Sequence, residues 1–233
     1  MNSTSPVYAI LRNTSMVDYP GRLSMVMFLS GCNFSCGFCH NAVLRHPQQD
    51  LMTWDRLEKS CREYRLNWVD AAVITGGEAT LSNDLSRLID LLKAQGFSVK
   101  LDTNGGLPDV LEKELPRLDY VAMDVKCSPE KYPELTGFSD TSAIARSIEL
   151  LKSKAADYEF RTTIVEPFHT DDEMRRLGEW IRGAKRYAIQ PYVPRDGVLD
   201  ETIRQLPRTT PARLKQLGDL MRPYVQTLEI RGA

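Results

Sequence analysis

The sequence predicts an α/β fold, a partial (β/α)6 barrel with fewer units than the eight-unit barrel. Two observations support this prediction. Short apolar runs of strand length alternate with amphipathic segments of helical length along the chain. Glycine-rich, cysteine-rich or charged motifs directly follow the first four runs, as expected where parallel barrel strands carry an active site at their C-terminal ends.

The first half of the chain sets this alternation. The strand predicted over 23–29 reads LSMVMFL and runs into a loop with three cysteines. A helix is expected from Thr53, with Cys61 on its apolar face and therefore in the core. The next strand, 71–75, ends in two glycines and precedes an amphipathic helix over about 85–92.

Helix-capping signals place two helices in the second half. The sequence TDDE is a capping box, in which Thr170 and Glu173 satisfy free amides at a helix start. Thr210 and Pro211 supply the N-cap and first-turn proline of the last helix. The remaining predicted elements are a helix over about 144–151 and strands over 97–101, 120–125, 158–165, 187–190 and 225–230.

Length and composition bound the function. We expect one domain with an N-terminal extension over about 1–21, a core over 22–195, and a C-terminal helix and strand over 196–233. The 30 basic and 31 acidic residues give no support to a nucleic-acid partner. No segment is apolar enough to span a membrane or act as a signal peptide. Five cysteines, three in one loop, favour a reducing cytoplasm over a disulfide framework.

The cysteine loop carries the strongest functional signal. Cys32, Cys36 and Cys39 have C-x3-C-x2-C spacing, and three such thiolates can hold three corners of a [4Fe–4S] cluster. The fourth iron would then be open to a ligand, which points to catalysis. A structural zinc site in a binding module is the alternative, with His40 as its fourth ligand, although His40 directly adjoins Cys39.

The spacing, with Phe38 just before the last cysteine, resembles the signature of the radical S-adenosylmethionine (radical SAM) enzymes. A Gly-Gly-Glu-Pro segment of that family binds the SAM amine. Gly76-Gly77-Glu78 matches this segment, but Ala79 replaces the proline. The resemblance therefore implies SAM contacts from the backbone of this segment and from Glu78.

Further motifs resemble the activating enzymes of glycyl radical enzymes, a branch of this family. They are DTNG at 102–105, MDVK at 123–126, MVDYPG at 16–21 and CHN at 39–41. The pattern is most similar to the activators of anaerobic ribonucleoside-triphosphate reductase over about 15–165. It implies SAM contacts from Phe38, Asn41, Gly76, Gly77, Glu78, Asp102, Thr103, Asn104, Lys126 and Arg161, and a monovalent cation at Asp102, Thr103, Met123 and Asp124.

Other polar positions carry weaker expectations. Arg161–Thr163 and Gln190–Tyr192 end strands where relatives contact ribose or adenine, and a related activator has a histidine in place of Val193. Val165 is expected in the core. We expect His46 and His169 to be surface or capping residues.

The resemblance also implies a reaction. One [4Fe–4S] cluster would cleave SAM to a 5′-deoxyadenosyl radical, which takes a hydrogen atom from a glycine of a partner enzyme, anaerobic ribonucleotide reductase in the most similar pattern. Flavodoxin or a similar low-potential protein would supply the electron. A radical SAM enzyme acting on a small molecule or peptide, such as a 7-carboxy-7-deazaguanine synthase relative, is the alternative within the family.

Overall fold

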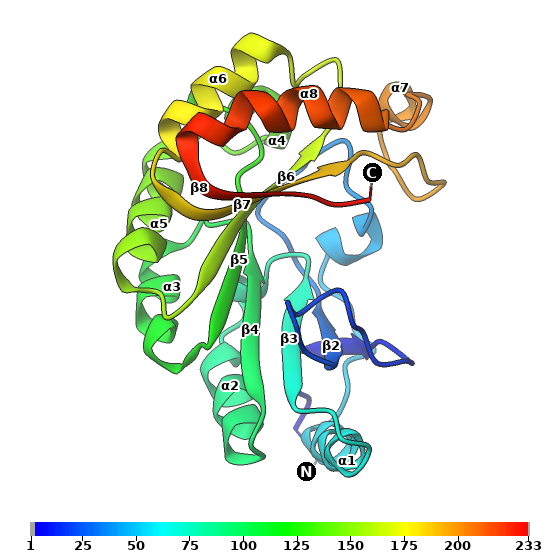
Figure 1. Ribbon diagram of the computed structural model, residues 1–233. Coiled ribbons are helices and arrows are strands. Elements are labelled where there is room, and N and C mark those ends of the chain that lie inside the picture. Colours follow the sequence, from blue (N-terminus) through cyan, green and yellow to red (C-terminus); the bar gives the residue numbers. More distant parts are fainter. Residues whose placement is uncertain (1–2, 233) are drawn as a thin grey trace.

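The computed structural model describes residues 3–232 and contains one curved sheet of eight strands in the order β1 to β8 (Figure 1). All neighbouring pairs are parallel except β1 with β2. The strands are β1 Val7–Ile10, β2 Ser24–Leu29, β3 Ala71–Gly76, β4 Ser98–Thr103, β5 Tyr120–Asp124, β6 Tyr158–Ile164, β7 Ala184–Pro191 and β8 Val225–Ile230.

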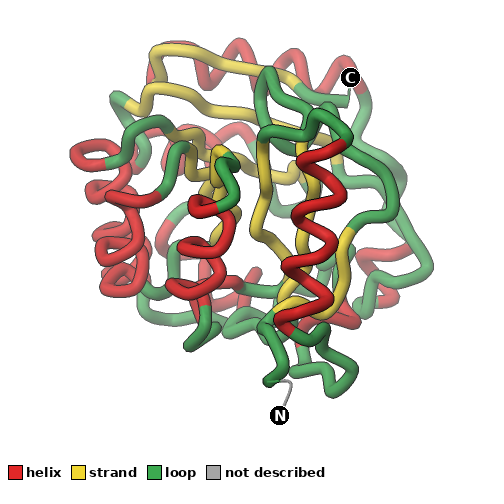
Figure 2. The backbone as a smooth tube through the Cα atoms, turned by 90° about the horizontal axis from the view of Figure 1, so that it is seen from below, coloured by secondary structure: helices red, strands yellow, loops and turns green. Residues whose placement is uncertain are grey.

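The helices form an outer layer around the sheet, which is plain when the molecule is seen from below (Figure 2). Among the described residues the edge strands β1 and β8 do not pair, so the barrel stays open on one side. The helices are α1 Trp54–Leu66, α2 Leu85–Ala94, α3 Pro108–Glu114, α4 Tyr132–Thr136, α5 Thr141–Lys154, α6 Asp171–Trp180, α7 Glu201–Arg204 and α8 Pro211–Met221.

The predicted fold class is confirmed, and each predicted strand has an observed counterpart. The predicted N-cap Thr210 is confirmed, because its side chain accepts a hydrogen bond from Arg213 N. The helix expected from Thr53 begins there, and Thr53 caps it by accepting from Arg56 N. The capping box is half right. Thr170 caps α6, but the buried Glu173 carboxylate accepts from the amide and hydroxyl of Ser128 and does not reach back to the helix start.

Four short elements were not predicted from the sequence. β1 has four residues, α3 seven, α4 five and α7 four, which is too short for a period to show. Strand β1 forms because its backbone pairs antiparallel with β2, with Ile10 opposite Met27. This strand covers an edge that the parallel units alone would leave unpaired.

Two apolar clusters lie on opposite faces of the sheet. The larger lies between sheet and helices and includes Cys61, as predicted, and Val165. The smaller lies inside the curve of the sheet, where Tyr19 from the N-terminal extension packs on Tyr120, with ring centroids 5.8 Å apart. The inner cluster therefore fills the barrel below the strand ends.

Strand register brings the motifs together. Leu29, which precedes the cysteine loop, lies opposite Gly76, and Asp124 lies opposite Arg161. Parallel strands in this register place the motifs that follow β2 to β5 together at the C-terminal ends of the strands. Among residues 3–232, no helix combines the length and apolar character that a bilayer crossing requires.

We expect Gly76→Ala to destabilise the fold by about 3 kcal/mol or to prevent folding. Gly76 has φ +136°, and a Cβ there would collide with the carbonyl oxygen of Leu29. Gly183→Ala is the matched control, since Gly183 also has a positive φ (+83°) but no atom within 4 Å of a Cβ. The control should cost only about 1 kcal/mol in urea unfolding. Equal losses in both variants would contradict the steric explanation.

Candidate active site

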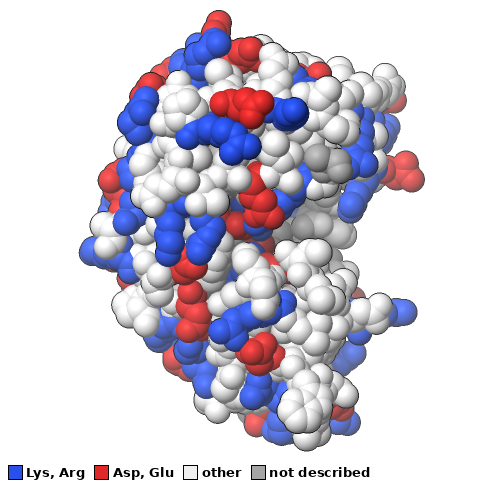
Figure 3. Space-filling view, in the orientation of Figure 1, with Lys and Arg blue, Asp and Glu red and all other residues white. Residues whose placement is uncertain are grey.

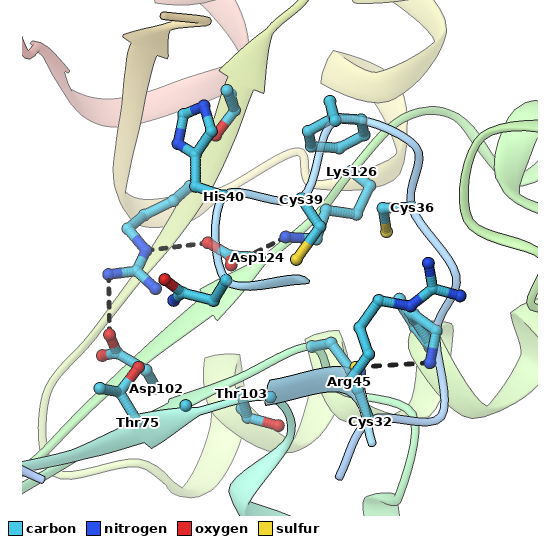
Figure 4. A pocket seen from close by; sticks show the side chains of 18 of the residues that line it. Cys32, Cys36, Cys39, His40, Arg45, Thr75, Asp102, Thr103, Asp124 and Lys126 are labelled. Atoms are coloured by element: carbon cyan, nitrogen blue, oxygen red, sulfur yellow. Dashed lines mark hydrogen bonds and ion pairs between the residues drawn. The ribbon is translucent and has the colours of Figure 1, made fainter. Parts of the chain in front are cut away.

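A cavity of about 350 Å³ lies at the C-terminal edge of the sheet, between the cysteine loop and the ends of β3 to β7 (Figure 4). The space-filling view shows the molecule hollowed on the side away from the outer helices (Figure 3). The lining includes Cys32, Cys36, Phe38, Cys39, Asn41, Gly76, Gly77, Asp102, Thr103, Asn104, Asp124, Lys126 and Arg161.

The three cysteines of the motif all line this cavity, and all are free thiols. Cys36 is buried, and the other two are partly exposed. Burial raises the pKa of Cys36 to about 11, although Lys126 opposes the shift. Burial also raises the pKa of Cys32. Because metal binding requires cysteines in the thiolate form, binding of a metal cluster here would release the thiol protons.

Backbone hydrogen bonds hold the cysteine loop in place. Gly31 N donates to Leu44 O at 2.8 Å, and Cys32 N donates to Arg45 O at 3.0 Å. On the other side, Glu78 N donates to Gly31 O at 2.8 Å. Gly77 allows this contact, because a Cβ there would meet the Gly31 and Leu44 carbonyl oxygens. The two glycines thus bring the end of β3 against the loop, as well as lining the cavity.

Glu78 differs from the expectation for its side chain. Its carboxylate is 2% exposed and is not part of the cavity lining. It accepts four hydrogen bonds, from Thr80 N, Thr80 Oγ1, Thr103 Oγ1 and Asn104 N. Burial raises the pKa of Glu78, and these donors oppose the shift. The side chain therefore ties the end of β3 to the end of β4.

Alternating charges cross the cavity wall from β4 to β6 in a ladder, defined as Lys100, Asp102, Arg161, Asp124 and Lys126. Lys100 donates to Asp102. Arg161 bonds to Asp102 at 3.2 Å and to Asp124 at 2.9 Å. Lys126 Nζ completes the ladder at 2.9 Å from Asp124, and the pairs that Asp102 and Asp124 make with Arg161 and Lys126 are drawn in Figure 4. Adjacent strands thus present paired charges to the cavity.

The pairing outweighs burial in setting the ionisation of the ladder. Burial alone would raise the pKa of Asp102 and of Asp124, but Arg161 and the neighbouring lysines hold both pKa values below the ordinary range. Burial would lower the pKa of Lys126, but Asp124 raises it overall. Lys100 lies deeper, and burial lowers its pKa. Both carboxylates are therefore ionised at neutral pH.

The proposed cation ligands are only partly assembled. Asp102, Thr103 and Asp124 line the cavity, whereas Met123 is fully buried and its side chain packs where a Cβ of Gly105 would lie. The hydroxyl of Thr103 donates to Glu78. The monovalent cation stays a prediction.

Several lining residues were absent from the predicted site, among them Asp18, Arg45 and Thr75. Lys100 belongs to the ladder and was also missed. The sequence could have indicated that Lys100 lies beside Asp102, because residues two apart in a strand share a face. For Arg45 the sequence held no comparable signal.

His46 is exposed, as expected, but the expectation for His169 is corrected. His169 is not a surface residue: it is fully buried, and its Nε2 lies 2.8 Å from Lys126 O. His40 lines the cavity, and its Nε2 lies 2.8 Å from Val193 O, so it pins the cysteine loop to the segment after β7. Thr163 and Gln190 line the cavity as well, as expected of those strand ends.

The radical SAM superfamily profile matches residues 26–181, which includes the cysteine loop and β2 to α6. The chain belongs to the radical SAM superfamily. This membership decides against the zinc-stabilised binding module. It also implies a [4Fe–4S] cluster and SAM as the cofactors.

Similar proteins of known sequence show to which branch of the superfamily the chain belongs. The chain is 34% identical over 225 residues to MJ1227 of Methanocaldococcus jannaschii, a protein named as a candidate glycyl-radical enzyme activating enzyme, covering 93% of this chain and 92% of the relative. It is 30% identical to the pyruvate formate-lyase-activating enzyme of Streptococcus mutans over 76% of this chain and 73% of the relative. This radical SAM enzyme therefore belongs to the branch that activates glycyl radical enzymes.

Solved structures agree on the fold. SuiB of Streptococcus suis, bound to its precursor peptide SuiA, superposes with a TM-score of 0.71 at 16% identity, covering 88% of this chain and 48% of that chain. A domain of a Bacteroides vulgatus pyruvate-formate lyase-activating enzyme gives a TM-score of 0.57 at 14% identity, covering 70% and 99%.

The residues present fit these cofactors. Three free thiols face one cavity, as a cluster with one open iron requires. The same cavity offers carboxylates and an ammonium group, which suit the amine and carboxylate of a zwitterion such as the methionyl part of SAM. A cluster takes each thiolate at a different iron, so the thiols need not converge on one point. Accordingly, among residues 3–232 no three His, Cys, Asp or Glu side chains are arranged to hold a single metal ion.

We expect Cys32→Ala, Cys36→Ala and Cys39→Ala each to lose the cluster iron and SAM cleavage after anaerobic reconstitution, because each removes one of three thiolate ligands. Iron content per chain and visible absorbance measure the loss. Cys127→Ala is the control, since Cys127 is buried close to the loop but does not line the cavity. Full iron content in any of the three variants would contradict the ligand assignment.

Arg161→Met should destabilise the protein by about 3 kcal/mol at pH 7, because it leaves two buried carboxylates without their shared partner. The wild-type carboxyl pKa values are depressed, so their stabilisation is present at neutral pH and is lost as pH falls through those values. The difference between wild type and variant should therefore shrink toward acid pH in urea unfolding.

Arg186→Met is the control for this experiment. Arg186 also projects from a strand and pairs with an aspartate, Asp157, but its side chain is 37% exposed against 16% for Arg161. Its loss should cost less than about 1 kcal/mol. A penalty for Arg161→Met that stays constant with pH would show that the ladder is not its source.

Proposed function

We propose that this enzyme generates the glycyl radical of anaerobic ribonucleoside-triphosphate reductase. The observation that carries the proposal is the cavity itself. Three free thiols and charged residues of the ladder line it, and the barrel that contains it is open between β1 and β8. A loop of a partner protein can reach such a cavity, whereas a closed barrel would exclude it. The DTNG, MDVK and CHN motifs support this particular partner.

When bound, the cluster and SAM would supply the radical chemistry that takes a hydrogen atom from a glycine of the partner. The protein binds and orients. We assign the SAM carboxylate to Lys126 and the SAM amine to Asp102 and to the backbone of Gly76 and Gly77. Arg161 holds Asp102 and Asp124 apart and ionised.

The remaining SAM contacts are proposed from position in the cavity. Phe38 is buried beside Lys126, whose Nζ lies 5.9 Å from the ring centroid. The ring therefore restricts the positions open to the Lys126 ammonium group. Asn41 and Thr103 line the same cavity. We propose a flavodoxin-like protein as electron donor and the cytoplasm, where thiols stay reduced, as the setting.

The partner is tested by electron paramagnetic resonance. The reconstituted enzyme, SAM and a reductant are mixed anaerobically with anaerobic ribonucleotide reductase, and separately with pyruvate formate-lyase. A glycine-centred doublet with the reductase supports the proposal. A doublet with pyruvate formate-lyase alone would transfer it to the second candidate, which the Streptococcus mutans relative and a 31% identical activator of Listeria monocytogenes favour.

Action on a small molecule has narrower support. The 7-carboxy-7-deazaguanine synthase of Neisseria meningitidis is 35% identical, but over 48% of this chain. Multiple turnovers of SAM that need a small substrate and no partner protein would favour that function over the proposed one.

We expect Lys126→Ala to weaken SAM binding about 10- to 100-fold, because it removes a charge-assisted hydrogen bond worth about 1.5–3 kcal/mol. The iron content should stay at the wild-type value, since Lys126 is not a cluster ligand. Equilibrium binding of SAM to the reconstituted enzyme measures the effect. Lys113→Ala, at an exposed lysine of α3, is the control. Loss of iron in Lys126→Ala would indicate a structural role.

A further inference from the structure

Asn104 lies at the end of β4 and touches the cysteine loop. Its Nδ2 donates to Asn33 Oδ1 at 2.8 Å and approaches Cys32 Sγ at 3.9 Å, within hydrogen-bonding range of sulfur. Within residues 3–232 it is the one side chain that donates to any of the three cluster cysteines. The other donor to Cys32 is the backbone amide of Phe34, at 3.4 Å.

The orientation of this side chain is set by its other contacts. The Asn104 Oδ1 atom accepts from Gly106 N at 2.9 Å, so the amide nitrogen must face the loop. The Asn104 backbone amide donates to the buried Glu78 carboxylate at 2.6 Å. The side chain is 6% exposed and therefore has few other positions open to it.

Gly106 completes this arrangement. A Cβ at Gly106 would lie 2.6 Å from Asn33 Nδ2 and 3.1 Å from Asn104 Oδ1. A larger residue there would push Asn104 and Asn33 out of their bonded positions. The turn after β4 is thus shaped to deliver one amide donor to the sulfur of Cys32.

We propose that Asn104 is a positioning residue whose amide donates to the Cys32 thiolate and raises the reduction potential of the cluster. A donor to a ligand sulfur draws electron density from it and favours the reduced, more negative cluster. Cys32 has the Phe34 amide and the Asn104 side chain as donors, whereas no side chain among residues 3–232 donates to Cys36 or Cys39. This assignment replaces the expected SAM contact of the Asn104 side chain. It depends on the cluster that the family implies, and not on the partner enzyme.

The test uses the reconstituted enzyme without SAM or partner. Asn104→Leu keeps the branching and approximate size of the side chain and removes the donor, and Asn104→Ala removes it without adding a methyl contact. Redox titration followed by electron paramagnetic resonance gives the midpoint potential, and iron content and circular dichroism establish an intact cluster and fold. Both variants should have a more negative midpoint potential than the wild type.

Asn33→Ala is the matched control, since it removes the loop contact of Asn104 without touching a donor to sulfur. Its potential should stay at the wild-type value. If Asn104 only braces the loop, the Asn104 and Asn33 variants should lose iron to a chelator faster while their intact clusters keep the wild-type potential. That result overturns the proposal, as does an equal shift of potential in Asn33→Ala. Since no partner enzyme is present, a negative result leaves the proposed function untouched.

Discussion

The active site depends on the position of Arg161 between Asp102 and Asp124. These groups come from three adjacent strands, and each would be costly to bury alone. Together they keep two carboxylates ionised in a largely enclosed wall of the cavity. The lysines at either end extend the alternation, so the wall presents both signs of charge within a few ångströms. A zwitterionic ligand finds complementary groups there that need no rearrangement.

A second constraint holds the cysteines opposite that wall. The loop hydrogen-bonds to the segment after it, through Leu44 O and Arg45 O, and to the end of β3, through Glu78 N. Glu78 links the two halves, because its backbone contacts the loop while its carboxylate holds Thr103 and Asn104. Glu78 is therefore one of the residues that fix the cysteine loop relative to the ends of β3 and β4.

Much of this could be predicted from sequence, because the signals are local. Apolar runs, capping threonines and the cysteine spacing each lie within a few residues, so they located the strands, the helix starts and the loop. The errors arose where a residue distant in sequence determines the contacts of a side chain. Glu173 looked like a capping residue but binds Ser128. His169 looked like a surface or capping residue but is fully buried, with Nε2 near Lys126 O. Lys100 looked like an ordinary strand residue.

By itself, the sequence determined the alternation of strands and helices, the three thiols and the order of motifs at the strand ends, since each is a property of neighbouring residues. Only the tertiary structure decided what each polar side chain of those motifs faces. Glu78 turned away from the cavity and Asn104 turned toward Cys32, because burial leaves every donor and acceptor to find a partner among groups that the fold, and not the chain order, brings near.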